Sequence, residues 1–429
     1  MGAIKSTFIH LPPREPWAPP MPGMLYEPLV PEEQSRIGIL IMHSDEDYLS
    51  FLSGPEFAKR GFRVLCTNVM SKEGIIYSQP DKMLNVLEAV KYLKRQPGVE
   101  KVVLLGHSGG GTLMSAYQCV AENGADFLQG SEKIVPYPDQ KEDLVPADGI
   151  MLLDTNWGNA AMQLFSLDPA VTDEESGMNL DPALDVYSPA NGFSPEGATY
   201  SPEFIRKFQN ALSERNNRLI DQALERLYLL EHGKGNFSDD EPFVIPGAEQ
   251  GFMNNKLYAQ DPRLMSHTKE PHLLLHGDGT QTTEIIRSIR TAENPQSFTH
   301  SLWQGARILS VRSFLSSYAV RTTPEFGYDE QEVWGIDWKS SYACPPGNMT
   351  GIHVPTLVMG MTAGWEFMAS ETIYNCSASE DKTIAFVEGA THKFEPAIRL
   401  EKSPGQYGDT VKTLHDFAAQ WLLSKDRFL

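Results

Sequence analysis

Continuous apolar runs alternate with amphipathic stretches in two parts of the chain, and a long segment with a different pattern separates these parts. Residues 37–42 (IGILIM) and 102–105 (VVLL) are short, apolar and bounded by polar positions, as in strands buried on both faces. Residues 81–96 place apolar side chains at helical spacing instead. This alternation predicts an α/β fold with a mostly parallel sheet flanked by helices.

The same patterns locate the expected elements and divide the chain. Strands are predicted at residues 37–42, 63–69, 102–105, 149–155, 354–360 and 382–387, and helices at residues 54–60, 81–96, 113–123, 204–230, 301–320 and 410–423. The alternation stops near Trp157, just after the strand predicted at residues 149–155. We therefore expect a proline-rich N-terminal arm (1–34), a first part of the core (35–156), a large, mainly helical insertion (157–352) and a second part of the core (353–429).

The strand at residues 102–105 ends in Gly106-His107-Ser108-Gly109-Gly110, and a helical pattern follows at once. A strand that turns sharply into a helix places the serine at the apex in a strained conformation and exposes its hydroxyl group. Gly106 and Gly110 leave room for the two elements to approach, because a Cβ atom at either position would clash. The motif predicts a nucleophile elbow with Ser108 as the nucleophile.

On these motifs, residues of about 35–156 and 353–429 resemble the α/β-hydrolase superfamily, and the insertion resembles the cap that many members carry. The resemblance implies a catalytic triad in the chain order serine, acid, histidine. Ser108 is then the nucleophile and His392, in the string Glu-Gly-Ala-Thr-His, the base. We expect Glu366 to be the acid, because it follows the preceding strand, with Asp154 at the end of the sixth strand as the alternative acid.

The resemblance also implies an oxyanion hole made of backbone N–H groups. One donor is expected from Gly109, the residue after the nucleophile, and the other from the loop that contains Ser44 and Asp45. Many members have His-Gly where this chain has His43-Ser44, so the loop departs from the family pattern. The charges of the run Asp45-Glu46-Asp47 are expected to face water, with selection of cationic or neutral substrates as the alternative.

Three further side chains are expected to line the substrate pocket: His43, His107 and Trp157, the last of these at the junction of core and cap. Residues 273–279 (LLLHGDG) mimic the end of a hydrolase strand. We interpret them as part of the cap; the alternative is a second sheet strand with Asp278 as the acid. The sequence shows neither the spacing of a metal site nor a dinucleotide fingerprint, so we expect no cofactor and no metal.

The composition limits the classes of molecule that we expect the protein to bind. The net charge of −20 argues against nucleic acid and anionic membranes, because both bind to basic surfaces. The four cysteines lack the spacing of a metal site or a disulfide scaffold, which favours a reducing compartment. We expect a cytoplasmic protein that binds a small-molecule acyl substrate, with a homodimer left open.

These features together predict a serine hydrolase that cleaves an ester, lactone or related acyl bond of a neutral, fairly apolar small molecule. The same triad also serves C–C bond hydrolysis, amide hydrolysis and acyl transfer. A protein that kept the fold as a non-catalytic ligand-binding protein is the alternative from another class.

Overall fold

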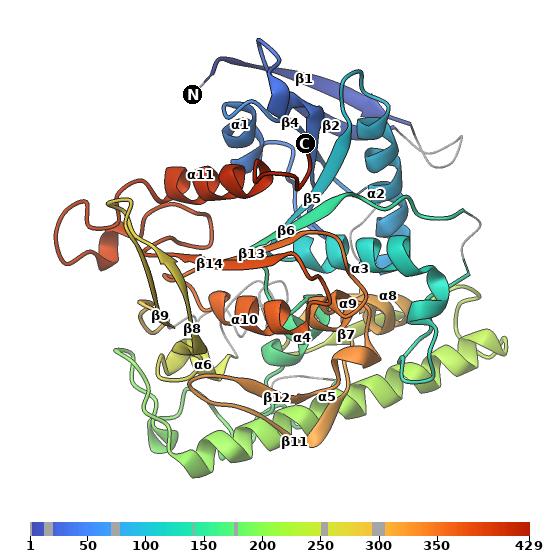
Figure 1. The fold of residues 1–429 in the computed structure, drawn as a ribbon. Helices are drawn as coiled ribbons and strands as arrows, with labels where there is room; N and C mark the ends of the chain where they lie inside the picture. The colour runs from blue at the N-terminus through green and yellow to red at the C-terminus, as the bar shows by residue number, and fades with distance from the viewer. Residues whose placement is uncertain are drawn as a thin grey trace.

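The computed structural model describes residues 2–12, 20–69, 78–139, 142–175, 179–249, 256–293 and 305–429 of the chain. A large twisted sheet runs through the molecule, with helices on both sides of it (Figure 1). Within the described ranges, no helix is both long and apolar enough to cross a membrane.

The main sheet has ten strands in the order β1-β2-β4-β3-β5-β6-β13-β14-β8-β9. Its strands are β1 (Ile4–Leu11), β2 (Met21–Pro28), β3 (Ile37–Ile41), β4 (Arg63–Thr67), β5 (Lys101–His107), β6 (Gly149–Leu153), β8 (His267–Leu275), β9 (Gln281–Arg287), β13 (Thr356–Met361) and β14 (Lys382–Val387). All pairs from β4 to β8 are parallel, and the pairs at both ends of the sheet are antiparallel. The predicted α/β fold with a mostly parallel sheet is confirmed.

Helices cover the two faces of this sheet unequally. One face packs against α1 (Ser53–Ala58) and α11 (Thr410–Leu422), and the other against α2 (Gln79–Lys94), α3 (Gly110–Asn123) and α10 (Phe367–Cys376). Each face has its own apolar core, since successive strand residues point to opposite sides. Strand β14 has the predicted bounds, and most other predicted core elements differ from the observed ones only at their ends.

The segment between β6 and β13 contains strands as well as helices. Its helices are α4 (Asn159–Ser166), α5 (Pro202–Glu231), α6 (Leu257–Gln260), α8 (Val311–Ser317) and α9 (Pro345–Met349), and its small two-stranded sheets pair β7 (Pro242–Ile245) with β10 (Arg307–Ser310) and β11 (Thr322–Tyr328) with β12 (Val333–Ile336). Short 3-10 helices complete the chain at Glu33–Arg36, Ala125–Leu128, Pro189–Asn191, Trp338–Ser340 and Ile398–Leu400. The helix expected at 301–320 is shorter, because β10 occupies its first described part, and residues 301–304 lie outside the described residues.

Two further segments extend the main sheet against expectation. Residues 273–275, interpreted as cap structure, belong to β8 and pair in parallel with β14, so the alternative of a sheet strand is correct. Asp278, just beyond β8, is exposed, and its carboxylate accepts hydrogen bonds from Thr280. Among the described residues, it makes no hydrogen bond with a histidine. The N-terminal arm likewise contains β1 and β2, which continue the sheet beyond β4.

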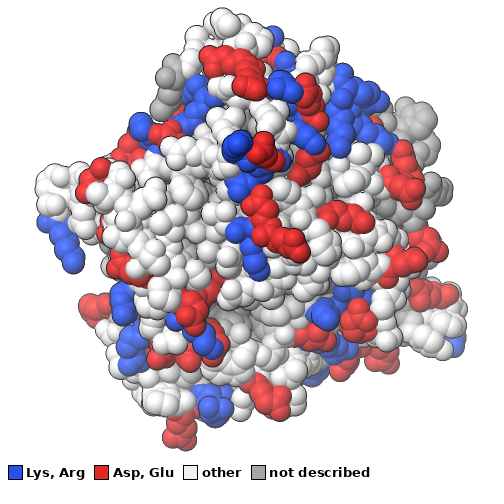
Figure 2. Space-filling model, in the orientation of Figure 1, with Lys and Arg blue, Asp and Glu red and all other residues white. Residues whose placement is uncertain are grey.

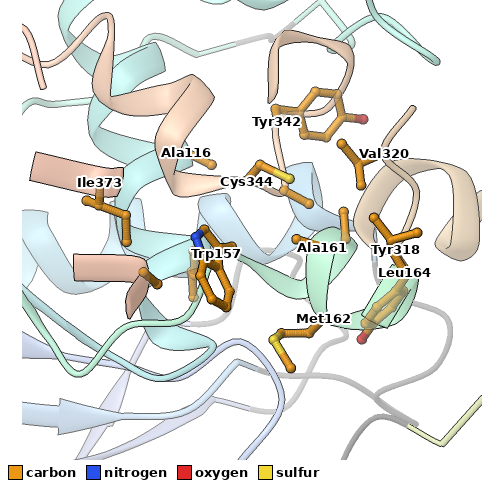
Figure 3. Close-up of a cluster of buried hydrophobic side chains, with 14 of the residues drawn as sticks. Ala116, Trp157, Ala161, Met162, Leu164, Tyr318, Val320, Tyr342, Cys344 and Ile373 are labelled. Atoms are coloured by element: carbon orange, nitrogen blue, oxygen red, sulfur yellow. The ribbon is translucent and has the colours of Figure 1, made fainter. Parts of the chain in front are cut away.

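The segment after β6 packs tightly onto the core at Trp157. Its ring lies among apolar side chains of α3, α4 and α10, which include Ala116, Met162 and Ile373 (Figure 3). On the face shown in Figure 2, acidic and basic side chains alternate, with wide uncharged areas between them.

Candidate active site

The turn between β5 and α3 holds Ser108 in a strained conformation. Its φ is +53°, in the left-handed region that non-glycine residues rarely adopt. The glycines around it allow the close approach: a Cβ on Gly106 would lie 2.6 Å from the Cα of Gly111, and one on Gly110 would lie 2.7 Å from the carbonyl oxygen of Met42. The sharp strand-to-helix turn predicted at Ser108 is therefore present.

The loop after β14 carries His392 and is fixed at both of its ends. The Gly389 N–H donates to the Thr362 hydroxyl at 2.8 Å, and the Thr391 N–H donates to the carbonyl oxygen of Glu395 at 2.8 Å. Buried Phe394 adopts a φ of +70°, a second strained residue in the site. The loop brings His392 against the elbow, with its ring centroid 4.5 Å from that of His107.

Two carboxylates meet the same nitrogen of His392. Asp154, at the end of β6, places Oδ2 2.7 Å from His392 Nδ1, and Glu366 places Oε1 3.7 Å from it. Asp154 is fully buried, and its Oδ1 accepts a hydrogen bond of 2.9 Å from the Met361 N–H. With a φ of +47°, Asp154 is strained like Ser108.

The acid expected from the sequence thus differs from the one that the hydrogen bond selects. Glu366 lies within ion-pair distance of His392, but its other oxygen accepts from the Trp365 N–H at 3.2 Å. Asp154 makes the short contact because the left-handed turn after β6 aims its side chain across the end of β13. The sequence order favoured Glu366, whereas the geometry favours Asp154, the alternative.

Electrostatics couple these three groups. Burial disfavours protonation of His392, but the charge of Glu366, with the hydrogen bond and charge of Asp154, raises the pKa of His392 to about 9. Burial, opposed by His392 and reinforced by the charge of Glu366, raises the pKa of Asp154. The two carboxylates therefore stabilise the imidazolium form of His392.

The same cluster has the spacing of a metal site. One ligand atom each of Asp154, Glu366 and His392 lies within 4.8 Å of the others. The hydrogen bond from His392 Nδ1 to Asp154 uses the ring nitrogen that faces both carboxylates. Within the described residues, no second group of this kind is present.

Ser108 and His392 make no hydrogen bond with each other among the described residues. Contacts between a nucleophile and its base are often long in unliganded enzymes and shorten when substrate binds. The ring of His392 is 32 % exposed, whereas Asp154 behind it has no exposure. The histidine is therefore open on the side away from its acid.

The loop after β3 is organised by the ring of His43. Its Nδ1 accepts hydrogen bonds from the N–H groups of Asp45 (3.0 Å) and Glu46 (2.9 Å). Burial lowers the pKa of His43 to about 4, so the ring is neutral and Nε2 carries the proton. This corrects one expectation: the Asp45 N–H is already occupied and is not free to bind an oxyanion.

The N–H groups of Ser44 and Gly109 donate to no acceptor in the described part of the chain. The two residues are neighbours, because a Cβ on Gly109 would lie 2.7 Å from Ser44 Oγ. They are the donors that the geometry leaves for an oxyanion. Of the expected donors, Gly109 and Ser44 therefore remain, and Asp45 is excluded because its N–H is occupied.

The Asp45 side chain is held by the protein and does not simply face water. Its Oδ1 contacts Lys82 Nζ at 2.7 Å and accepts from the Tyr318 hydroxyl at 2.9 Å. Its Oδ2 accepts from Ser44 Oγ at 2.7 Å and from Asn159 Nδ2 at 3.0 Å. Burial works against the charge of Asp45, but Lys82 outweighs it and holds the pKa of Asp45 well below its usual range.

The structure places the three expected pocket residues differently. His43 is buried, with its ring stacked on Tyr48. His107 is buried and contacts the backbone of His392. Trp157 is 1 % exposed and stacks on Trp365, with ring centroids 6.1 Å apart, so its observed contacts are those of a core residue. A contact of any of the three with substrate stays a prediction.

Sequence reasoning missed several side chains that support the site. Lys82, Asn159 and Tyr318 were not singled out, although together they fix Asp45. One signal was available for Lys82, which lies within the amphipathic run 81–96 next to apolar Met83. The contact of Tyr318 depends on the fold of the long segment after β6 and has no local signal.

The strand order, the strained serine after β5 and the histidine after β14 define a protein of the α/β-hydrolase fold. No protein-family model matches the sequence, and no curated protein matches it. Among solved structures, the chain is similar to hypothetical protein PA2218 from Pseudomonas aeruginosa, with 12 % identity, coverage of 99 % of this chain and 94 % of that chain, and a TM-score of 0.43.

It is also similar to Est1E from Butyrivibrio proteoclasticus, with 11 % identity, 97 % coverage of both chains and a TM-score of 0.39. A third similar structure is EstE1, a thermophilic carboxylesterase cloned from a metagenomic library, with 10 % identity, coverage of 98 % of this chain and 90 % of that chain, and a TM-score of 0.41. At these scores, the class of the protein rests on its own strand order and on the positions of Ser108 and His392.

Proposed function

We propose that the protein is a serine hydrolase that cleaves an ester, lactone or related acyl bond of a neutral small molecule. The observation that carries the proposal is the strained Ser108 at the β5–α3 turn, next to a histidine whose Nδ1 lies 2.7 Å from a buried carboxylate. Strain at a serine is costly and persists where the surrounding structure enforces it, most often at functional sites.

In the proposed reaction, His392 Nε2 takes the proton of Ser108 as the hydroxyl attacks the acyl carbon. His392 then gives the proton to the leaving group, and a water molecule activated in the same way hydrolyses the acyl-enzyme. Asp154 accepts the Nδ1–H bond, which keeps the proton-accepting nitrogen on the Ser108 side and stabilises the imidazolium ion. We assign Asp154 as the acid of the triad on this contact.

The tetrahedral intermediate carries a negative oxygen that needs fixed donors. The unoccupied N–H groups of Gly109, at the N-terminal end of α3, and of its neighbour Ser44 support this role. The loss of one such donor costs about 3–4 kcal/mol of transition-state stabilisation in a serine protease. The Asp45 network maintains the loop conformation that keeps the Ser44 N–H free.

A fluorophosphonate probe tests the proposal, because it reacts covalently with an activated serine. We expect the wild-type protein to be labelled at Ser108, and Ser108→Ala to remain unlabelled. Ser115→Ala is the matched control: Ser115 lies on α3, is buried and bonds to the carbonyl oxygen of Thr112. A folded wild-type protein that resists the probe would instead favour a non-catalytic binding protein.

The chemical class of the bond is tested separately by turnover. Esters, lactones, amides and thioesters of neutral small acids are compared at equal concentration, with Ser108→Ala as the blank. Preferential hydrolysis of esters or lactones supports the proposal. Turnover of amides or transfer to an added alcohol alone would assign the same triad to an amidase or an acyltransferase.

A further inference from the structure

A chain of hydrogen bonds joins the elbow to the loop of the catalytic histidine through His107. The His107 Nε2 lies 2.7 Å from the carbonyl oxygen of His392, and its Nδ1 lies 2.6 Å from the Tyr48 hydroxyl. A carbonyl oxygen only accepts, so Nε2 carries the proton and donates it. Nδ1 of the neutral ring then accepts from Tyr48. Both contacts fix one tautomer of His107.

The surroundings of His107 keep the ring neutral and immobile. It is 3 % exposed and packs against Phe51 and Phe394, with ring centroids 5.0 Å and 4.8 Å away. Burial, reinforced by the nearby His392, lowers the pKa of His107 well below its usual value. A buried ring held by hydrogen bonds at both nitrogens keeps its Nε2–H directed at the same carbonyl group.

We infer that His107 is a positioning residue, which fixes the backbone of His392 relative to Ser108 by hydrogen-bonding the His392 carbonyl oxygen from the position adjacent to the nucleophile. This inference rests on the proposed function of Ser108 and His392. The loop of His392 and the elbow are far apart in sequence, and the contact ties them together through the side chain of His107 and the backbone carbonyl oxygen of His392. Tyr48 acts one step further away, by holding the tautomer.

Such positioning matters because the proposed reaction tolerates only small displacements of the reacting groups. A misplacement of about 1 Å between reacting groups can reduce the rate by roughly 10²-fold. The Nδ1 contact with Asp154 fixes one side of the His392 ring, but a hydrogen bond at Nδ1 alone leaves the backbone of the loop free to shift. The His107 contact removes that freedom from the residue itself.

The test compares two variants at position 107. In His107→Gln, the amide nitrogen replaces Nε2 as donor to the carbonyl group, whereas His107→Leu fills the space without a donor. We expect His107→Leu to reduce kcat and the rate of fluorophosphonate labelling by about 10²-fold with little change in KM. His107→Gln should restore both rates to within about tenfold of wild type.

The matched control is His415→Gln. His415 is also buried between two hydrogen bonds, from Nδ1 to the carbonyl oxygen of Val411 and between Nε2 and Ser53 Oγ, but it lies on α11, and these two hydrogen bonds involve neither Ser108 nor the loop of His392. It should alter stability and leave kcat unchanged. Equal labelling rates in folded His107→Leu and wild type would overturn the inference, as would Gln and Leu variants with equally reduced rates.

A second variant covers the case in which His107→Leu does not fold. Tyr48→Phe keeps the stacking with His43 and Phe51 but removes the donor to Nδ1. We expect a lower kcat at unchanged KM, with a shift of the downfield proton resonance of His392 Nδ1–H. If this resonance and kcat both remain at wild-type values, the inference fails. An unlabelled wild-type protein, in contrast, would contradict the proposed function itself.

Discussion

Two carboxylates around His392 Nδ1 distinguish this site from a simple triad. Asp154 makes the hydrogen bond and Glu366 adds its charge at 3.7 Å. Both raise the pKa of His392 above its usual value, which favours the imidazolium form, and that form accepts no further proton. Rates measured at several pH values can therefore separate the effect of the Asp154 hydrogen bond from that of the Glu366 charge.

Asp154→Asn should reduce kcat by about 10⁴-fold at every pH, because the amide no longer selects the tautomer of His392. Glu366→Gln should keep kcat at its alkaline plateau within about tenfold of wild type. The measurement is the steady-state rate on the best ester of the substrate panel. A large loss in Glu366→Gln with little loss in Asp154→Asn would assign Glu366 as the acid.

The wild-type rate should rise with pH toward about 9, because kcat/KM follows the neutral fraction of His392. In Glu366→Gln, the loss of a negative charge lowers the pKa of His392 and moves the rise to lower pH. The profile of kcat/KM from pH 5 to 10 checks this shift. Glu395→Gln, an exposed change in the same loop, is the control and should leave the profile in place.

At the residue scale, the sequence was sufficient to locate the strained Ser108 and the histidine that lies against its turn, but not the carboxylate that contacts this histidine. Ser108 follows from a local motif, and His392 from its position after the last parallel strand. The acid depends on whether the turn after β6 adopts a left-handed φ, and nothing in the local sequence at Asp154 requires this. His107 was singled out, but its contact with a backbone carbonyl was not predictable.

The elements around the site are joined by one buried ion pair. Lys82 on α2 has no exposure, and Asp45 in the loop after β3 is 29 % exposed. Tyr318, at the end of α8, bonds to the same carboxylate. The loop that supplies the Ser44 N–H is thus held by a core helix and by the segment inserted after β6.

Lys82→Met should lower the free energy of unfolding by about 3–5 kcal/mol, because it leaves the Asp45 carboxylate without its cation. The double variant Lys82→Met/Asp45→Asn should recover part of this loss. Lys101→Met is the control: Lys101 pairs with Asp148 at the surface, and its loss should cost less than about 1 kcal/mol. Urea unfolding measures all three, and equal losses at Lys82 and Lys101 would contradict the role of the pair.

Helix α3 approaches the turn after β6 too closely for any side chain at Gly111. A Cβ there would lie 2.0 Å from Thr155 Cγ2, so Gly111→Ala should destabilise the fold by about 1–3 kcal/mol. Gly111→Ala/Thr155→Ala should regain part of this stability. Thermal unfolding compares the two, and a single variant as stable as wild type would show that the elements separate without cost.

The secondary structure of the core was predictable because its apolar residues recur at clear strand or helix spacing. Strand β14 and helices α2 and α11 lie within one or two residues of the expected bounds. The segment after β6 was harder, because β8 carries only a short apolar run (273–275) and β9 is mostly polar and exposed, and both lie within a region expected to be mainly helical. The place of β8 in the main sheet depends on its pairing with β14, a long-range contact, and β9 joins the sheet through β8.

At the scale of the whole molecule, buried neutral histidines link stability to pH. Burial lowers the pKa of His415 to about 4, while the unfolded value is 6.5. Such a group contributes stability above pH 6.5, which is lost as the pH falls toward 4, because only the unfolded state then takes up the proton. His43 and His107 add contributions of the same sign.

His415→Gln should therefore reduce the slope of the free energy of unfolding against pH between pH 4 and 6.5 by about 1.4 kcal/mol per pH unit. The variant need not be as stable as wild type, because the comparison is of slopes. Urea unfolding at several pH values gives the measurement. An unchanged slope would mean that His415 is already neutral in the unfolded chain or charged in the folded one.

Ser108 and Asp154 follow β5 and β6, which are neighbours in the sheet, and the long segment begins only after Asp154. A growing polypeptide completes this pair before most of residues 157–352 exist. The parts of that stretch outside β8 and β9 that do not contact the Asp45 loop can lengthen, shorten or change shape over evolutionary time, because the register of β5 and β6 keeps the distance between the Ser108 hydroxyl and Asp154. Remodelling of the middle of the chain then changes what lies around these two side chains and leaves their relative position intact.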